Sequence, residues 1–530
     1  MNTSYDAVVI GAGHNGLTTA AYLARAGVST LLVEARHIVG GTAASERLGD
    51  SVVNVCNCDH FAFRTTPIAE ELDLASHGLT YIDLDPAQVN GSWESDRWWP
   101  SYFALDRTVE AIARVLPDEA RNYERYVHDA LPVVNLILEA ARRPPSVGGL
   151  LGVVARQKGI GAQRLLRWSR MSTLQVLQEY FRAPEIIGPA LIEGPMVWGV
   201  SPTMKRTGLG ALPLAMRHAG RLGRPIGGSG ALTDALHASF TAAGGVTRLG
   251  TRVTAIVCHG ETSRSVELSD GDVIDARVVI SACNPHDTFL TWLRNPPPSA
   301  RNLVRRWRAT PRAVGYESKI DAVIDGSISF KALDNDLLGD LNQLPATYLV
   351  APSAEKVQHG YTLMESGGIL RQPAFLVNVP SLADTTLTTP GQHVFSLEAL
   401  FTPYGFSDGW DSDSEPRRWL SEFDSLLIDP VTPRLVDWRA VTPRDYESDF
   451  HLPAGHATSF AGGPLAAFAP RDPELVRYRT AVANLYITGA ATFPGSGVWG
   501  ASGRNAAQVV LADLGLGPKK LRRRGQRPAS

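Results

Sequence analysis

The chain has 530 residues, of which 44% are hydrophobic and 20% charged, so it has the composition of an ordinary globular protein and the length of two or three domains. A formal net charge of −2 gives no reason to expect nucleic-acid binding. No apolar window approaches about 18 residues, and the short segment before the first apolar run carries no positively charged side chain, so we expect neither a transmembrane helix nor a signal peptide.

The first predicted elements are a buried strand, a glycine turn and a helix. The apolar run over residues 6–10 leads into the motif GAGHNG at residues 11–16, and a helical pattern follows it. In this context G-x-G-x-x-G is typical of a dinucleotide site. Gly11 permits the tight turn, Gly13 lets a pyrophosphate approach the backbone, and Gly16 lets the helix pack against the strand. The other motif residues expected beside the ligand are His14 and Asn15.

A second strand is predicted over residues 30–33, and it ends in Glu34. A carboxylate at this position accepts the ribose hydroxyls of a dinucleotide and repels a 2′-phosphate, although Arg36 close by weakens that argument. The further residues expected along the same ligand are Ala35, Arg36, Gly41 and Thr42.

The cysteines do not predict redox chemistry. Four cysteines are few for this length, which favours a reducing compartment. Cys56 and Cys58 form a C-x-C pair, which is closer than the redox C-x-x-C spacing and lacks the second pair that a zinc site needs. We therefore expect both cysteines to be packing residues, no metal site, and no disulfide-reductase activity.

Two long insertions interrupt the predicted dinucleotide domain. Residues 76–224 show mostly helical patterns, broken by the Arg-Arg-Pro-Pro sequence at 142–145. Residues 291–469 alternate strand-like runs with Pro and Gly turns, which suits an antiparallel sheet. Between the insertions, the β-rich stretch 246–280 includes a predicted hairpin turn at 269–272.

The C-terminal part again predicts a strand, a glycine-rich loop and a helix, which should begin near Val498. A second helix N-terminus is unnecessary for NAD, but it suits a flavin, because reduced flavin carries negative charge near N1 and O2. The last residues include the basic run at 519–524. Two interpretations of this run stay open: a solvated tail, or a segment attracted to an anionic membrane surface or an acidic partner.

The combined motifs resemble those of the phytoene-desaturase and amine-oxidase superfamily of FAD-dependent flavoproteins, and within it the branch of pyridine nucleotide-disulphide oxidoreductase domain 2 proteins. The resemblance covers nearly the whole chain. Its blocks are GAGHNG, VEAR…VGGTAAS, FRTTPIAEELDLASHGL, PIGGSGALTDAL, VVISACNP and LYITGAATFPGSGVWGASGRNAA.

The expected architecture is α/β, with a Rossmann-type FAD-binding domain built from discontinuous segments and a mixed α+β substrate domain. The FAD-binding segments are residues 1–75, 225–290 and 470–515. Residues 76–224 and 291–469 form the substrate domain, whose antiparallel sheet is the pocket floor that the resemblance implies and whose other insertion is helical. Residues 516–530 form a basic, disordered tail.

The resemblance also implies roles for single residues. Gly11, Gly13 and Gly16 would hold the FAD pyrophosphate, and Glu34 the adenosine ribose. Further implied contacts are Gly41 and Thr42 with the phosphates, the Val253 backbone with adenine, Gly489 and Ala490 with the pyrophosphate and ribityl chain, and Val498 and Trp499 with the isoalloxazine edge. Glutathione-reductase-like flavoproteins commonly carry an acid where this chain has Ala490, so side-chain contact with ribityl is in doubt there.

Catalytic side chains are not evident, because a flavin supplies the reactive atom itself. His60 and His456 are pocket candidates, and each has packing as its alternative. No general base is assigned.

The predicted function is an FAD-dependent dehydrogenase or oxidase that removes hydride from a C–H bond of a small apolar or aromatic substrate, by desaturation or C–N oxidation. One alternative is a membrane-associated carotenoid desaturase that acts on a polyene; another is a flavin-binding scaffold with little turnover. The expected location is the cytoplasm, with peripheral membrane contact through the basic tail as the alternative.

Overall fold

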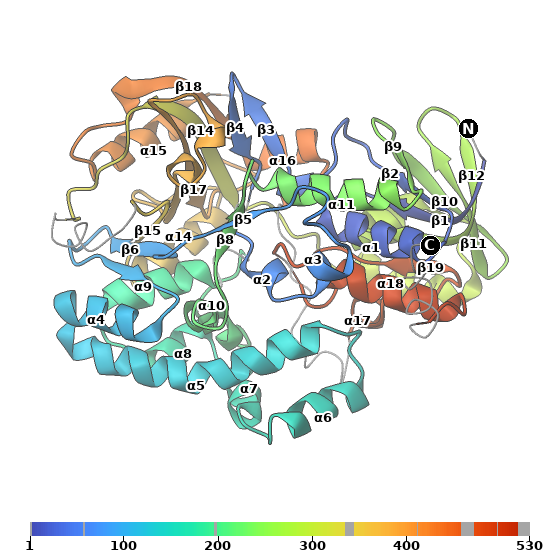
Figure 1. The fold of residues 1–530 in the computed structure, drawn as a ribbon, viewed down its shortest axis with the longest axis horizontal. Coiled ribbons are helices and arrows are strands. Elements are labelled where there is room, and N and C mark those ends of the chain that lie inside the picture. Colours follow the sequence, from blue (N-terminus) through green and yellow to red (C-terminus); the bar gives the residue numbers. More distant parts are fainter. Residues whose placement is uncertain are drawn as a thin grey trace, which may run out of the picture.

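The computed structural model describes residues 3–56, 59–194, 199–333, 344–410, 412–456, 471–495 and 497–517. Figure 1 shows a sheet with helices against it on the right, a second sheet at the upper left, and a group of helices below both. Among the described residues, no helix is both long enough and apolar enough to cross a membrane.

The first sheet is built around β1, whose side chains are buried on both faces. Ala7 and Val9 belong to one apolar cluster, while Val8 and Ile10 belong to another on the opposite face, as alternation along a strand requires. The strand order is β13-β10-β11-β12-β1-β2-β9, and β19 also pairs with β12. Pairs β1–β2, β1–β12, β2–β9 and β12–β19 are parallel, and β10–β11–β12 is an antiparallel meander. The bounds are β1 Ser4–Ile10, β2 Thr30–Val33, β9 Val246–Arg248, β10 Val253–His259, β11 Thr262–Leu268, β12 Val273–Ser281, β13 Leu293–Arg294 and β19 Leu485–Ile487.

The strands of this sheet come from three stretches of the chain, and β13 lies just beyond the segment 225–290 that we assigned to the FAD-binding domain. The predicted hairpin turn at 269–272 joins β11 to β12. The bounds of the domains beyond these strands stay predictions.

Three helices cover one face of the first sheet, with α1 (His14–Arg25) in contact with both α11 (Gly230–Ala242) and α18 (Ala501–Asp513) (Figure 1). A Cβ at Gly16 would lie 2.0 Å from the Gly11 oxygen, and one at Gly503 would lie 2.2 Å from the Asn15 oxygen. Only glycine permits these approaches of α1 to the strand turn and to α18.

The last helix begins at Ala501, so the predicted start near Val498 is wrong by three residues. Gly497 and Gly500 have φ angles of +95° and +66°, and this left-handed backbone cannot belong to an α-helix. The glycine-rich loop therefore extends further than its sequence pattern indicated.

The second sheet has seven strands in the order β18-β14-β17-β16-β15-β6-β7. Its pairs are antiparallel except β15–β6, so the predicted antiparallel sheet is present with one parallel pair. Two of its strands, β6 and β7, come from the first insertion, where we expected mostly helices. The bounds are β18 Leu435–Val441, β14 Glu317–Asp325, β17 Gln392–Leu400, β16 Phe375–Asn378, β15 Thr347–Ala351, β6 Gln88–Ser92 and β7 Trp99–Ser101.

Most of the rest of the first insertion is helical, as its apolar periodicity predicted. Its helices surround an aromatic core that includes Tyr123, Tyr126 and Phe181, which are all fully buried. The helices are α4 Leu105–Val115, α5 Pro117–Ala141, α6 Val147–Arg156, α7 Ala162–Trp168, α8 Thr173–Gln178, α9 Pro184–Glu193 and α10 Pro213–Met216.

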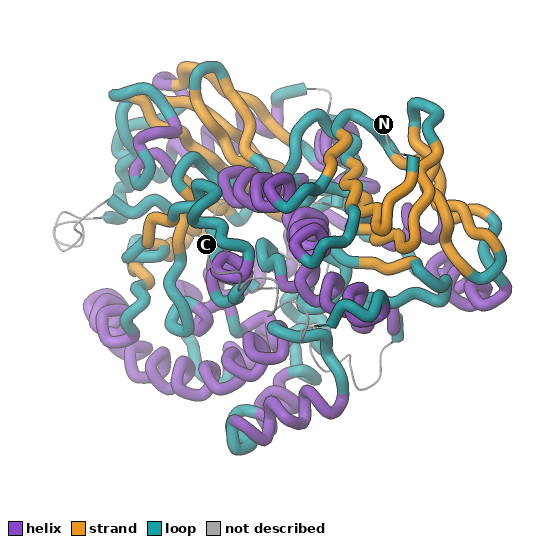
Figure 2. Tube along the Cα trace, turned by 45° about the vertical axis from the view of Figure 1, so that its right-hand side comes forward, coloured by secondary structure: helices purple, strands orange, loops and turns teal. Residues whose placement is uncertain are grey.

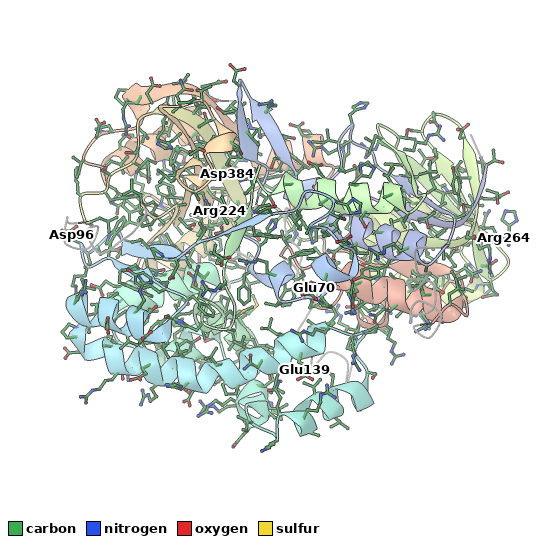
Figure 3. The ribbon with its side chains drawn as sticks, in the orientation of Figure 1. Glu70, Asp96, Glu139, Arg224, Arg264 and Asp384 are labelled. Carbon is green, nitrogen blue, oxygen red and sulfur yellow. The ribbon has the colours of Figure 1, made fainter. Side chains whose placement is uncertain are left out.

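Two short two-stranded ribbons and a buried arginine connect the two sheets and the helical insertion. The ribbons are β3 (Ser45–Leu48) with β4 (Ser51–Asn54), and β5 (Tyr81–Asp83) with β8 (Gly223–Pro225). In β8, the buried Arg224 donates hydrogen bonds to Asp59 and to Thr347 and Asn378 of the second sheet (Figure 3). The remaining α-helices of the described residues are α2 Phe61–Arg64, α3 Ile68–Glu71, α12 Arg301–Ala309, α14 Ala354–Glu365, α15 Ser414–Asp424, α16 Pro443–Phe450 and α17 Pro473–Arg477.

Candidate functional site

A cavity of about 1180 Å³ opens at the carboxyl ends of the parallel strands of the first sheet. Its lining includes the residue that follows each of three strands, namely Gly11 after β1, Glu34 after β2 and Ala282 after β12, and it includes Gly489, two residues after β19. In open α/β sheets this edge is where ligands bind. The volume exceeds the usual range of about 300–1000 Å³ for one small ligand.

The first glycine loop leaves room for a ligand at the start of α1. Gly13 is the residue before the helix, and no side chain of the described chain caps it. A Cβ built on Gly13 meets no described atom within 4 Å, and Gly13 lines the cavity. The uncapped N–H groups of the first helical turn are donors for a phosphate.

His14 and Asn15 also line the cavity, and both connect the two glycine loops. The Asn15 side chain accepts a hydrogen bond from the Gly503 N–H at 3.3 Å and contacts the His14 ring at 3.0 Å. Burial lowers the pKa of His14 to about 4, so the ring is neutral near pH 7. The N-terminus of α1 and the start of α18 are therefore held together beside the cavity.

Glu34 presents a buried carboxylate at the end of β2. One oxygen accepts the Ala12 N–H at 2.7 Å and the other accepts the Arg36 N–H at 2.9 Å. Each carboxylate oxygen accepts more than one hydrogen bond, so capacity for ribose hydroxyls remains. Glu34 lines the cavity together with Ala35.

An acidic partner compensates the positive charge of Arg36, which a 2′-phosphate would need as its own partner. Its guanidinium pairs with Glu46 and lies 4.3 Å from the centre of the Phe450 ring. Its Nη1 is buried and has no hydrogen-bond partner in the described structure, so one donor is left at the cavity wall. This arrangement suits an adenosine with a free 2′-hydroxyl better than one with a 2′-phosphate.

The other predicted dinucleotide contacts also line the cavity, namely Gly16, Gly41, Thr42, Val253, Gly489 and Ala490. Gly40 pairs with Gly13 as an isolated bridge, which brings the Gly41 turn against the first glycine loop. Val253 is the first residue of β10, the second strand after Gly244-Gly245, because the short β9 intervenes. Gly489 has a φ of +105° and approaches the Ala282 carbonyl, so this turn also requires glycine.

Val498 and Trp499 do not line the cavity among the described residues, contrary to their predicted place at the isoalloxazine edge. Val498 is 7% exposed and belongs to the apolar cluster beneath α1. Trp499 packs beside Phe493 and Leu150 of α6. The Val498 side chain is therefore buried, and the Trp499 side chain is partly buried against this second cluster.

The two histidine candidates lie in different surroundings. His60 is fully buried, contacts the Tyr81 hydroxyl at 3.0 Å and the Ser229 hydroxyl at 2.9 Å, and does not line the cavity. His60 is therefore not the pocket residue we expected, because both ring nitrogens serve the packing of β5 and α11. His456 does line the cavity, and its ring lies edge-on to Tyr316 with centroids 5.7 Å apart.

The Cys56-Cys58 pair can be assessed only at Cys56, because Cys58 lies outside the described residues. Burial raises the pKa of the Cys56 thiol well above its ordinary value, and the thiol lies 3.5 Å from the Glu317 carboxylate. A protonated thiol is a poor nucleophile. This supports the packing role that we predicted for Cys56.

The part of the cavity beyond the dinucleotide residues was predicted from the sequence only at His456. It is lined by Tyr316, Tyr361, Met364, Tyr404 and His456. These residues belong to α14 and to loops beside the second sheet, so only the tertiary fold brings them together. No local motif could have identified the four residues other than His456.

A buried row of charges on β14 was also missed. Lys319 is 2% exposed, forms an ion pair of 2.6 Å with Asp321, and donates a hydrogen bond to the Asn54 carbonyl. Asp321 pairs in turn with Arg439 of β18 at 3.3 Å. The alternation Glu-x-Lys-x-Asp from residue 317 placed these charges on one strand face, but a charged face is ordinarily exposed and gave no signal of burial.

Known proteins share this fold and these motifs. Residues 9–71 match the family described as NAD(P)-binding Rossmann-like domain, and residues 159–314 match the family described as Flavin containing amine oxidoreductase. The chain is 28% identical to pyridine nucleotide-disulfide oxidoreductase domain-containing protein 2 of Mus musculus, over 97% of this chain and 94% of that protein. It is 26% identical to one of the subunits of limonene dehydrogenase from Castellaniella defragrans, over 96% of this chain and 95% of that protein.

Solved structures show the same architecture. Cyclohexylamine oxidase from Brevibacterium oxydans superposes with a TM-score of 0.59 at 15% identity, over 96% of this chain and 99% of that chain. This confirms the predicted α/β class with a Rossmann-like domain. The matched families and relatives support an FAD-dependent oxidoreductase that acts on small molecules, similar over residues 159–314 to the flavin-containing amine oxidoreductases.

Proposed function

We propose that the protein binds FAD along the strand ends of the first sheet and oxidises a C–H bond of an apolar or aromatic small molecule. The observation that supports this is the continuity of the cavity, which runs from the glycine loops to the aromatic lining around Tyr316, Tyr361 and Tyr404. The similarity to a limonene dehydrogenase adds support, since limonene is an apolar hydrocarbon.

The proposed cofactor contacts follow from the geometry of the lining. Gly13 and the first turn of α1 would hold the pyrophosphate, Glu34 the adenosine ribose, and the Val253 backbone the adenine. Gly41, Thr42, Gly489 and Ala490 would lie along the phosphates and the ribityl chain. Val498 and Trp499 would stabilise the C-terminal glycine-rich loop by packing on its side away from the cofactor.

Bound flavin supplies the hydride acceptor. The chain's own residues would orient the substrate and exclude water, with Tyr316, Tyr361 and Met364 as an apolar wall. Burial lowers the pKa of His456 to about 4, so this ring is neutral near pH 7 and places no charge beside an apolar substrate. His456 would act as a hydrogen-bonding group that positions the substrate.

Two alternatives stay open. A carotenoid desaturase would take a long polyene through the same aromatic lining, and a flavin-binding scaffold would hold FAD with little turnover. Substrate reduction of the flavin distinguishes them: a polyene alone would reduce it in the first case, and no substrate would in the second.

The test is anaerobic flavin reduction with the purified holoprotein. Denaturation should release FAD and not FMN, because FMN lacks the adenosine that Glu34 and Val253 would hold. A panel of cyclic terpene hydrocarbons, polyenes and primary amines should contain a compound that bleaches the flavin. The change His456→Asn should slow that bleaching without abolishing it, because the hydride passes directly to the flavin.

Nicotinamide nucleotides should leave the flavin oxidised. Another glycine-rich run that resembles a fingerprint, Gly227–Gly230, lacks the G-x-G-x-x-G spacing. In the structure its Gly227 N–H binds Asp384, and a Cβ on Gly228 would clash with Ser45, so this turn is filled by protein groups. Rapid stoichiometric bleaching by NADPH alone would contradict the proposal and identify a reductase.

We also infer a cytoplasmic protein. Its few cysteines support this, and the three that the structure describes are unpaired. The basic run at 519–524, whose alternative role is contact with a membrane or acidic partner, lies outside the described residues.

A further inference from the structure

The helices α6 and α7 form a lobe that projects from the lower edge of the molecule, away from both sheets (Figures 1 and 2). We call residues 142–170, which comprise these helices and their flanking turns, the docking lobe. Its two helices pack on α5, and α6 places Leu150 in a small buried cluster with Phe493 and Trp499 of the C-terminal glycine-rich loop. The inner side of the lobe is thus fixed to the body of the enzyme.

The docking lobe exposes several large apolar side chains to solvent. Four of the fourteen exposed large hydrophobic residues in the described chain fall within twenty positions here. Their exposed fractions are 47% for Val147, 58% for Leu151, 57% for Ile160 and 48% for Leu166. Because Val147 and Leu151 are four residues apart on α6, they lie on one face of that helix.

The docking lobe is also positively charged. Residues 142–170 contain seven Arg and Lys residues and no Asp or Glu. Three of these cations pair with acids of neighbouring helices: Arg156 with Glu139 (labelled in Figure 3), Arg164 with Asp129, and Arg167 with Glu179. The others are exposed and form no ion pair within the described structure; they are Arg142, Arg143, Lys158 and Arg170.

We propose that the docking lobe binds the surface of a membrane that contains anionic lipids. Exposed apolar side chains flanked by Lys and Arg are the chemistry of an interfacial membrane contact, in which the apolar groups enter the headgroup boundary and the cations approach lipid phosphates. α6 has ten residues, which is half of what a membrane span needs, so the lobe lies on the membrane.

The charge of the lobe argues against other occupants. Two copies of the chain that met through their lobes would bring two sets of unpaired cations together. A protein partner would ordinarily meet an interface core depleted of Lys, whereas here Lys158 lies two residues from Ile160. An anionic bilayer satisfies the apolar and the charged groups at once.

This inference does not depend on the flavin chemistry, so its test needs no substrate. The full-length holoprotein is sedimented with vesicles of phosphatidylcholine alone and with vesicles that also contain phosphatidylglycerol. We expect binding to the anionic vesicles, weakening as salt rises, and little binding to the neutral ones. The paired changes Leu151→Ser with Ile160→Ser, and Arg143→Glu with Lys158→Glu, should each lower the partition coefficient by about ten-fold or more.

The matched control is Ile428→Ser, because Ile428 is 66% exposed and belongs to a turn beside the second sheet. This variant should bind vesicles like the parent. All the changed side chains are exposed, so every variant should keep the parent's flavin content and melting temperature, and this separates lost docking from lost folding.

Three results would overturn the proposal. The first is the absence of binding to anionic vesicles by the parent. The second is that both lobe variants bind anionic vesicles as well as the parent does. If neutralising Lys519 and Lys520 then removes that binding, the membrane contact belongs to the C-terminal tail. The third is concentration-dependent self-association in sedimentation velocity that Leu151→Ser with Ile160→Ser abolishes, which would make the lobe an interface between copies.

Discussion

Gly13 and Gly16 of the first glycine loop have different roles, and adding a side chain at each position distinguishes these roles. A Cβ at Gly13 enters open cavity space from an ordinary φ of −66°, whereas a Cβ at Gly16 would lie 2.0 Å from the Gly11 oxygen. Gly13→Val should therefore melt close to the parent temperature but retain at least about ten-fold less FAD, because its methyl groups occupy the pyrophosphate path.

The controls are Gly16→Ala, which should lose stability and flavin together, and Gly148→Ala on α6, where a Cβ also meets no described atom within 4 Å and neither property should change. Flavin absorbance per folded protein and thermal melting measure both quantities. Full FAD occupancy in Gly13→Val would mean that this loop does not hold the pyrophosphate.

Buried His60 should make the fold sensitive to acid. Burial lowers the pKa of His60 from 6.5 to about 3, so the folded protein keeps this ring neutral while the unfolded chain takes up a proton. Its contribution to stability is complete above pH 6.5 and is lost as the pH falls toward about 3. Between pH 6.5 and about pH 5 the loss is about 2 kcal/mol.

We expect His60→Gln to be less stable than the parent near pH 7 but to lose about 2 kcal/mol less on acidification to about pH 5. Urea unfolding at both pH values measures this difference. The change His359→Gln, at an exposed histidine, is the control and should keep the parent's pH dependence. An unchanged dependence in His60→Gln would show that the buried ring takes up a proton in the folded state.

At the scale of elements, the sequence predicted those strands and turns whose backbone geometry requires particular residue types. β2 was predicted at its observed residues and β1 with a start two residues too late, both joined to the glycine loop, because a close phosphate approach requires glycine and a buried parallel strand is continuously apolar. β6 was missed because Val89 is its only large apolar residue and its neighbours Gln88 and Asn90 are also buried, bonding each other at 2.6 Å, so apolar periodicity could not reveal the strand. The aromatic part of the cavity was missed because distant elements build it.

The charged face of β14 joins elements that the sequence does not connect. Asp321 lies between Lys319 on its own strand and its cross-strand partner Arg439 on β18, and Arg439 also pairs with Glu46 of β3 at 2.7 Å. Removing the Asp321 charge would leave two cations beside each other, one of them deeply buried, and a broken buried pair costs far more than an exposed one.

Asp321→Asn should therefore lower the free energy of unfolding by about 3–5 kcal/mol. The matched control is Asp325→Asn, four residues along the same strand and exposed, which should stay within about 0.5 kcal/mol of the parent. Equilibrium denaturation measures both. A loss in Asp321→Asn no larger than that of the control would mean that water reaches this charge row.

At the scale of the whole molecule, one buried arginine connects the β5–β8 ribbon, which lies between the two sheets in Figure 1, to the second sheet. Arg224 is 3% exposed and reaches Asp59, Thr347 and Asn378 at once (Figure 3). The proposed flavin lies on the first sheet and the aromatic lining lies beside the second, so their relative position decides whether a substrate C–H bond meets the flavin. A planar guanidinium with five donors can fix that position, whereas a single ammonium cannot reach the same acceptors.

We expect Arg224→Lys to retain FAD, because none of the proposed cofactor contacts changes, but to slow substrate-dependent bleaching by about ten-fold and to lose about 2–4 kcal/mol of stability, since buried acceptors are left without donors. The matched control is Arg264→Lys, an exposed arginine on β11 (Figure 3), which should change neither quantity. Stopped-flow bleaching and denaturant unfolding measure the two effects. If the flavin of Arg224→Lys were bleached at the parent rate, apolar contacts would be enough to hold the two sheets in position. Substrate oxidation would then not depend on the hydrogen bonds of Arg224.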